Sequence, residues 1–195
     1  MRSRLAMLAA TVLVLGWVVA PPAARAAGAD APTRTVASSG PLQVGAAAPS
    51  FAGWTLKGDM LSLSKLVAPP REKVADVVVV SFFATWCEPC KKNLPALERV
   101  IARSTDRVVR GVLVGYAQGA DEIAPFATKY RVSLPVIPDP FAKISERCGV
   151  TRALPRTFLV DGKGRVAAIF EHEGSDFEAA LARVVAAVPP SAAPR

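Results

Sequence analysis

Apolar and polar positions divide the chain into an N-terminal apolar run, a polar stretch and an alternation of short elements. Residues 77–83 are apolar on both faces, which is typical of a central strand that is covered on both sides. Apolar residues at helical spacing predict a helix over residues 88–103, directly after that strand. Further helices are expected over residues 121–130, 141–148 and 176–187, and further strands over residues 108–116, 157–160 and 166–170. Residues 134–137 form a short apolar piece.

Two turn signals predict hairpins. Gly58-Asp59 lies between residues 54–57 and 60–63, which predicts a short N-terminal β-hairpin. Asp161-Gly162-Lys163-Gly164 joins the last two expected strands and is a stronger signal. Strand–helix–strand followed by a hairpin and a helix predicts an α/β fold with a mixed central sheet flanked by helices.

The first 26 residues are typical of a targeting segment. Arg2 and Arg4 form a basic region, residues 5–20 are apolar, and Ala24-Arg25-Ala26 supplies small residues at the positions that a signal peptidase recognises. This pattern predicts a secretory signal peptide over residues 1–26 and a mature protein in the periplasm or secreted. The alternative is an uncleaved N-terminal helix that anchors the protein to the inner membrane.

The rest of the chain predicts one folded domain. Residues 27–43 lack periodicity and are expected to form a flexible linker, and residues 188–195 a disordered tail. The domain is therefore expected over residues 44–187, and we expect it to be monomeric.

The formal net charge of +8 falls to +5 when residues 1–26, which hold three arginines and no acid, are removed. The remaining basic residues are interspersed with acids rather than gathered with aromatic residues in a stripe. A nucleic-acid partner is therefore not expected.

Cys87 and Cys90 are separated by two residues at the junction of an expected strand and an expected helix. This arrangement is typical of thioredoxin-like redox sites. A thiol at a helix N-terminus faces unpaired backbone N–H groups and the positive end of the helix dipole, and both favour the thiolate. Cys87 is therefore expected to attack and Cys90 to resolve the mixed disulfide, while Pro89 suits the first helical turn.

Other uses of the pair are a structural disulfide, half of a zinc site, or haem attachment. The chain has no second CxxC motif and its only histidine is His172, which argues against zinc. Haem attachment requires histidine directly after Cys90, where Lys91 stands. Neither a metal nor another cofactor is expected.

Two further groups of residues have competing interpretations. Cys148 is either a third redox cysteine or a small buried hydrophobic residue, and the usual burial of cysteine favours the second interpretation. Glu171, His172 and Glu173 end an expected strand and could bind a metal, but a solvated strand end is the preferred interpretation.

Three motifs together resemble a known family. They are Val44-Gly45…Ala48-Pro49-Ser50-Phe51, Phe82-Phe83-Ala84-Thr85-Trp86-Cys87-Glu88-Pro89-Cys90-Lys91, and Leu154-Pro155-Arg156-Thr157-Phe158-Leu159-Val160-Asp161. They are similar to the TlpA-like branch of the thioredoxin superfamily, with its AhpC/TSA-redoxin-like domain. That branch comprises extracytoplasmic thiol–disulfide oxidoreductases, some of which reduce apocytochrome c before haem attachment.

The resemblance implies a thioredoxin-like fold and a set of site residues. It implies that Pro155 is a cis-proline beside the disulfide, and that the backbone of Leu154 binds an extended substrate. It further implies that Trp86 belongs to the docking surface and that Pro95 kinks the first long helix. The implied partners are protein disulfide substrates and a membrane electron donor.

The chain departs from the family at two positions. Ser81 stands where thioredoxins carry a buried acid, and Asn93 stands where some cytochrome-maturation members carry glutamate. Both acids are thought to relay protons to and from the resolving cysteine, so Glu88, Lys91 or water must take that role here. We therefore expect Cys90 to keep a high pKa.

Other functions on a similar fold fit the residues less well. A peroxiredoxin needs Pro and Thr where this chain has Val80 and Ala84. A DsbA-like oxidant would carry histidine between the cysteines and an inserted helical domain, whereas Glu88-Pro89 and the compact length favour a reductase. A copper chaperone-like binding module would need methionine or histidine clusters, and residues 27–195 hold only Met60 and His172.

Overall fold

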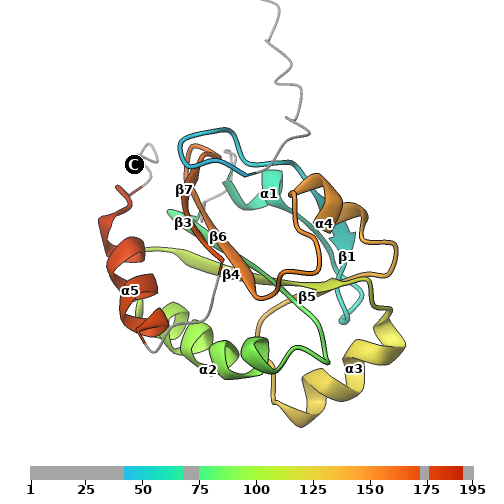
Figure 1. Cartoon of the computed structure of the whole chain (residues 1–195). Helices are drawn as coiled ribbons and strands as arrows, with labels where there is room; N and C mark the ends of the chain where they lie inside the picture. The colour runs from blue at the N-terminus through green and yellow to red at the C-terminus, as the bar shows by residue number, and fades with distance from the viewer. Residues whose placement is uncertain (1–41, 68–74, 172–175, 191–195) are drawn as a thin grey trace, which may run out of the picture. The chain divides into compact units, whose positions relative to one another are not determined.

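The computed structural model describes residues 42–67, 75–171 and 176–190. In this part of the chain, a five-stranded mixed sheet has the order β5-β4-β3-β6-β7 (Figure 1). β3 is central, parallel to β4 and antiparallel to β6. The predicted α/β fold with a mixed sheet is confirmed. The strands are β3 (Val77–Phe83), β4 (Val109–Tyr116), β5 (Val136–Asp139), β6 (Arg156–Asp161) and β7 (Val166–Phe170).

Every residue of β3 is buried, as its apolar sequence predicted. Alternate side chains of the strand point to opposite faces of the sheet. Val79 and Phe83 belong to one buried cluster, and Val80 and Phe82 belong to another. The sheet is therefore covered on both faces.

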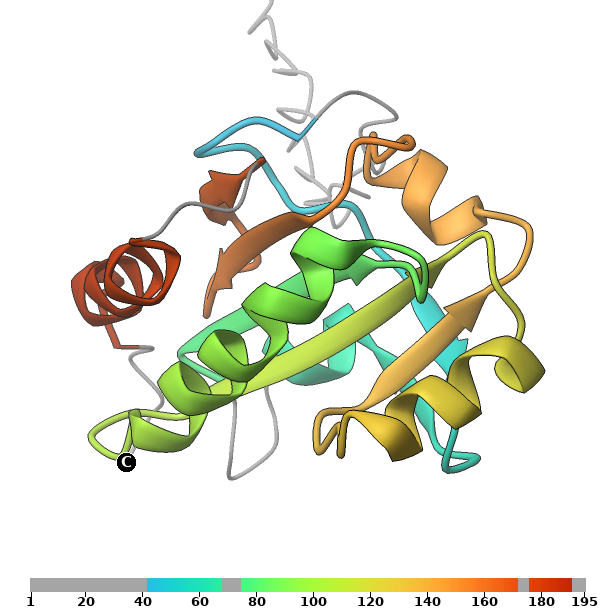
Figure 2. The ribbon, with the colours of Figure 1, turned by 60° about the horizontal axis from the view of Figure 1, so that its bottom comes forward.

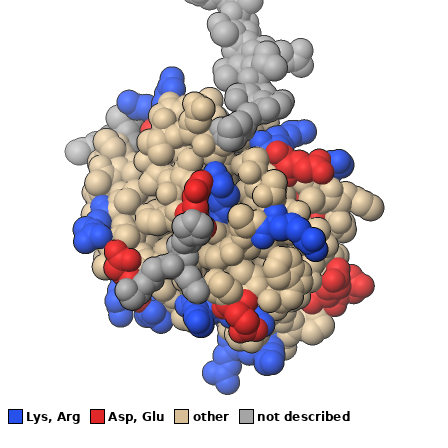
Figure 3. Space-filling view, viewed as in Figure 1, with Lys and Arg blue, Asp and Glu red and all other residues tan. Residues whose placement is uncertain are grey.

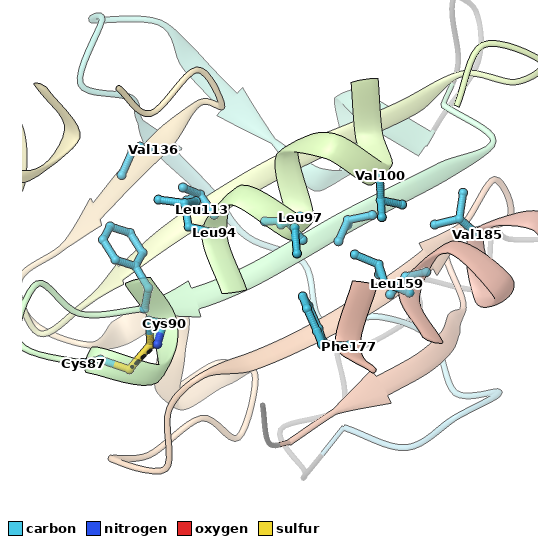
Figure 4. Close-up of a cluster of buried hydrophobic side chains, with 14 of the residues drawn as sticks. Cys87, Cys90, Leu94, Leu97, Val100, Leu113, Val136, Leu159, Phe177 and Val185 are labelled. Carbon is cyan, nitrogen blue, oxygen red and sulfur yellow. Dashed lines mark hydrogen bonds between the residues drawn. A yellow bond between two sulfur atoms is a disulfide. The ribbon is translucent and has the colours of Figure 1, made fainter. Parts of the chain in front are cut away.

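The helices divide between these two faces (Figures 1 and 2). α2 (Glu88–Arg103), α3 (Ala120–Lys129) and α5 (Phe177–Ala187) contribute to the first cluster, part of which Figure 4 shows. α1 (Leu63–Val67) and α4 (Lys143–Arg147) lie on the second cluster. The bounds of α2 match those predicted, whereas α1 was not predicted because five residues are too few to show a helical period.

The predicted N-terminal hairpin is present, but its first strand ends earlier than expected. β1 (Ala52–Trp54) pairs with β2 (Met60–Ser62) in antiparallel register. The hydroxyl of Thr55 accepts hydrogen bonds from the backbone N–H groups of Lys57 and Asp59, at 3.3 and 3.2 Å. This side-chain turn takes residues 55–57 out of the strand.

The predicted bounds of α4 were wrong, since the helix covers residues 143–147 instead of 141–148. The strand before it, β5, covers residues 136–139 and overlaps the short apolar piece at residues 134–137. The buried carboxylate of Asp139 accepts hydrogen bonds from the backbone N–H groups of Ile144 and Ser145, at 3.2 and 2.8 Å. The strand therefore runs on to Asp139, whose side chain holds the start of the helix.

The folded part extends slightly beyond the range expected for it. Leu42, inside the predicted linker, is buried in the second cluster. Val188, inside the predicted tail, is buried, and its carbonyl accepts a hydrogen bond of 2.8 Å from Arg107. The predicted signal peptide, most of the linker and His172 lie outside the described residues. Among the helices of the described part, none is long and apolar enough to cross a membrane.

Candidate active site

Cys87 and Cys90 form a disulfide where β3 leads into α2 (Figure 4). Cys87 is the N-cap of the helix, and its sulfur accepts a hydrogen bond from the backbone N–H of Cys90 at 3.2 Å. Pro89 occupies the first turn, where its missing N–H removes no helical bond. The predicted placement of the pair between a buried strand and a helix is confirmed.

The two cysteines have unequal surroundings. The sulfur of Cys87 is held at the N-terminus of α2, where unpaired N–H groups and the helix dipole favour negative charge. Cys90 lies inside the first turn and faces the first buried cluster. Both are almost buried, with 4% and 5% of their surfaces exposed. Helix position therefore favours Cys87 as the thiolate once the disulfide is reduced.

Gln118 fixes the loop that leads to Cys87. Its side-chain oxygen accepts a hydrogen bond from the backbone N–H of Thr85 at 2.7 Å, and its side-chain nitrogen donates to the Thr85 hydroxyl at 2.7 Å. The same nitrogen donates to Glu122 in the first turn of α3, at 3.3 Å. Gln118 is 5% exposed, so its two hydrogen bonds to Thr85 are shielded from water. They hold the active-site loop to the segment that follows β4.

The sequence contained a signal for Gln118 that was missed. Gln118 follows β4, and β4 runs parallel to β3. The carboxyl ends of parallel strands meet at one edge of a sheet, where ligand sites form. A polar side chain just after β4 could therefore have been expected beside Cys87.

Next to the two cysteines, Lys91 forms an ion pair with Glu88. The hydrogen bond from Lys91, its charge, and the charges of Lys92 and Lys129 lower the pKa of the Glu88 carboxyl. Glu88 is therefore a weaker base than an ordinary glutamate. Elsewhere on the face shown in Figure 3, basic and acidic side chains are interspersed.

The residues expected to bind substrate lie around the disulfide. Trp86 precedes Cys87 and is 55% exposed. Pro155 is buried, lines one cavity together with Cys90, and follows a cis peptide bond, as predicted. Leu154 is half-buried against both buried clusters, the first of which holds the two cysteines.

Ser81 and Asn93, the two positions at which the chain departs from the family pattern, lie at one cavity beside Cys90. Ser81, on β3, and Asn93, one turn beyond Cys90 on α2, line the same cavity of about 10 Å³. Ser81 is hydrogen-bonded to the hydroxyl of Thr157 on β6, at 2.8 Å. The region where related proteins place an acid is therefore polar and neutral in this protein.

The structure does not bring Cys148 to the site. Cys148 is fully buried in the second cluster, whereas Cys87 and Cys90 belong to the first. Burial raises the pKa of its thiol to about 12. These surroundings support the interpretation of Cys148 as a small buried hydrophobic residue. Glu171 is paired with Arg156 at 3.0 Å, and the described residues form no cluster of possible metal ligands.

Replacing Gln118 tests its role in holding the loop. Gln118→Ala removes both bonds to Thr85 and leaves a backbone N–H without its acceptor, so the free energy of unfolding should fall by about 1–3 kcal/mol. Chemical denaturation of the oxidised protein measures this change. Gln43→Ala is the matched control, because Gln43 is exposed. Equal denaturation midpoints for Gln118→Ala and wild type would contradict the assignment.

Cys148 should be unreactive in the native protein. A Cys87→Ser/Cys90→Ser double variant, whose only thiol is Cys148, should take up iodoacetamide at pH 8 only after denaturant is added. The Cys90→Ser variant is the control and should gain one label, at Cys87. Because the pKa of Cys148 rises from 9.0 to about 12 on folding, its contribution to stability is complete below pH 9 and lost towards pH 12. Rapid native labelling of the double variant would show that Cys148 is accessible.

Comparisons with known proteins agree with this geometry. Residues 44–169 match the model of the AhpC/TSA family. The thiol-disulfide oxidoreductase ResA of Bacillus thuringiensis is 28% identical over 125 residues, which cover 64% of this chain and 68% of ResA. The thioredoxin-like protein YneN of Bacillus subtilis is 29% identical over 125 residues, covering 63% of this chain and 68% of YneN.

Solved structures show the same fold. A structure described as the thiol:disulfide interchange protein DsbE of Chlorobium tepidum superposes with a TM-score of 0.66 and 26% identity, covering 75% of this chain and 98% of that one. DsbF of Mycobacterium tuberculosis superposes with a TM-score of 0.60 and 26% identity, covering 71% and 95%. The predicted thioredoxin-like fold is confirmed. The chain belongs to the AhpC/TSA family, and its CxxC disulfide on a thioredoxin-like fold makes it a thiol–disulfide oxidoreductase.

Proposed function

We propose that the protein is an extracytoplasmic reductase of protein disulfides, in which Cys87 attacks the substrate and Cys90 resolves the mixed disulfide. The observation that carries this proposal is the position of Cys87 as the N-cap of α2, with its sulfur accepting the N–H of Cys90. This position favours the thiolate at Cys87 over the thiolate at Cys90.

The reaction transfers two electrons to the substrate. The Cys87 thiolate attacks one sulfur of the substrate disulfide; that disulfide breaks, and its other sulfur leaves as a thiolate and takes up a proton. The Cys90 thiol then loses its proton to solvent and attacks Cys87 Sγ, which forms the intramolecular disulfide seen in the structure. The second substrate sulfur leaves and is protonated in turn.

The surface around the pair suits an extended polypeptide. Trp86 exposes an aromatic ring beside the nucleophile. The backbone N–H and C=O of Leu154 take part in no hydrogen bond with the residues that the structure describes, so they are available to a substrate strand. Pro155 forms part of the wall next to Cys90. We propose that Trp86, Leu154 and Pro155 hold the substrate disulfide in line with Cys87.

The location follows from the N-terminal sequence. The basic and apolar pattern of residues 1–26 supports export, with the cleaved protein in the periplasm or secreted, or an uncleaved helix that anchors it. Outside the cytoplasm a reductase needs electrons from elsewhere, and we propose a membrane dithiol donor as their source. Among the protein disulfides outside the cytoplasm that such a reductase would reduce is that of apocytochrome c before haem attachment.

Cysteine variants test the catalytic roles. With insulin as the disulfide substrate and dithiothreitol as the donor, Cys87→Ser should lower turnover to the uncatalysed rate, because serine supplies no thiolate. Cys90→Ser should still attack but accumulate a mixed disulfide detectable by mass spectrometry. Cys148→Ala is the matched control and should retain wild-type turnover. Wild-type activity in Cys87→Ser would remove the proposed mechanism.

The reduction potential tests the direction of electron flow. DsbA is a strong oxidant because its reduced form is stabilised. In this protein the groups that line the cavity beside Cys90 are uncharged, so no cation among them stabilises the Cys90 thiolate. The potential of the pair, measured by equilibration with glutathione, should lie nearer the value of about −270 mV for thioredoxin than that of about −120 mV for DsbA. A value close to that of DsbA would identify an oxidant.

A further inference from the structure

The side-chain nitrogen of a half-buried asparagine has no hydrogen-bond partner among the described residues, and it lies close to the resolving cysteine. The side-chain nitrogen of Asn93 is buried and forms no hydrogen bond with the described residues. The described residues contain one other such atom, Arg156 Nε, but that guanidinium is bonded to Glu171 through another nitrogen. Burying an amide without a partner costs about 1–3 kcal/mol in proteins, so the position of Asn93 calls for a reason.

Asn93 and Cys90 share a face of α2. They are three residues apart, which places their side chains next to each other along the helix. Both line the cavity of about 10 Å³ that separates α2 from β3 and Pro155. A cavity of that size holds about one water molecule when polar groups line it.

The cavity has a second polar group. The Ser81 and Thr157 hydroxyls are 2.8 Å apart, and both residues are buried. In such a pair one hydroxyl donates to the other, so one of the two hydrogens is left for another acceptor. Ser81 is the member of the pair that lines the cavity, and it can donate into the cavity when the Thr157 hydroxyl donates to Ser81.

Apart from Cys90, no group that lines the cavity is ionisable. β3 and β4 contribute Ser81, Phe83 and Leu113, and the other elements contribute Asn93, Leu94, Leu97, Phe126, Pro155 and Phe177. The nearest charged residues along α2 are Glu88, Lys91 and Lys92; Glu88 and Lys91 are bonded to each other, and Lys92 is exposed. An amide and a hydroxyl are therefore the polar groups that face the resolving sulfur.

We propose that the Asn93 amide, with the Ser81 hydroxyl and one cavity water, donates hydrogen bonds to the Cys90 thiolate as it forms. In the oxidised protein the Cys90 sulfur is uncharged and the Asn93 side-chain nitrogen has no hydrogen-bond partner among the described residues. In the resolving step the charge on Cys90 supplies an acceptor. The inference rests on the proposed function, because it concerns the second step of that reaction.

The chemistry needs no additional reactant. The Cys90 thiol gives its proton to solvent, and the thiolate attacks Cys87 Sγ while the donors hold it. The Cys87–substrate bond breaks, the Cys87–Cys90 bond forms, and the substrate sulfur leaves as a thiolate. Asn93 and Ser81 keep their protons throughout, so they stabilise charge but do not relay a proton. The rate of the resolving step should therefore follow the titration of a single group, the Cys90 thiol.

The two steps can be followed separately with 5,5′-dithiobis(2-nitrobenzoate) and the fully reduced protein. Attack by Cys87 releases the first thionitrobenzoate, and attack by Cys90 on the mixed disulfide releases the second. Stopped-flow absorbance from pH 5 to pH 10 gives both rates. The variants are Asn93→Asp, which keeps the shape of the side chain but removes its N–H donors, and Asn93→Leu, which removes its polarity.

Asn93→Leu should slow the second release about tenfold at pH 7, which corresponds to a pKa of Cys90 about one unit higher. The first release should stay within about twofold of wild type, because Asn93 does not line the helix N-terminus. Asn93→Asp should add a second inflection to the pH profile, from the new carboxyl group. Gln43→Leu is the matched control, an exposed amide changed to the same residue.

Stability of the oxidised protein separates this role from a structural one. Asn93→Leu should be at least as stable as wild type in chemical denaturation, because it removes an amide that has no partner. A second release that matches wild type over the whole pH range in both variants would overturn the inference, as would equal slowing of both releases. Failure of the wild-type protein to release either thionitrobenzoate would overturn the proposed function as well.

Discussion

β3 is buried between helices on both of its faces, and the point where it ends determines where the reactive cysteines lie. The strand ends at Phe83, and residues 84–87 join it to α2. The loop between them is held to the adjacent strand end by Gln118. Cys87 therefore sits at a helix N-terminus that the core keeps in place, and the environment of its sulfur depends on the packing of the sheet.

The same arrangement gives two neighbouring cysteines different chemistry. Cys87 faces the N–H groups at the start of α2, whereas Cys90 faces a cavity between α2 and β3. In the mechanism that we propose, helix electrostatics acts on the first sulfur and hydrogen-bond donors act on the second, so that Cys87 attacks and Cys90 resolves. The absence of an acid at Ser81 and Asn93 changes how the second sulfur is stabilised, but leaves the first unchanged.

The sequence predicted those features that depend on local patterns. The bounds of β3 and α2 were correct because a strand buried on both faces and an amphipathic helix each have a clear period, and the CxxC motif located the disulfide. Gln118 was missed because its place after β4 points to Cys87 only once β4 is taken to lie parallel to β3. Asp139 was missed because its partners lie in a loop geometry that has no period. Asn93 was recognised as a departure from the family, but its unpaired amide could be found only from the packing around it.

The central claim is that the two thiols of the reduced protein ionise separately, Cys87 first. The most direct test is the rate of iodoacetamide alkylation of each cysteine between pH 4 and pH 11, with the modified residue identified by mass spectrometry. The account predicts that Cys87 is labelled first and reaches its full rate at a lower pH than Cys90. Ionisation of both thiols together near neutral pH, or earlier labelling of Cys90, would contradict it.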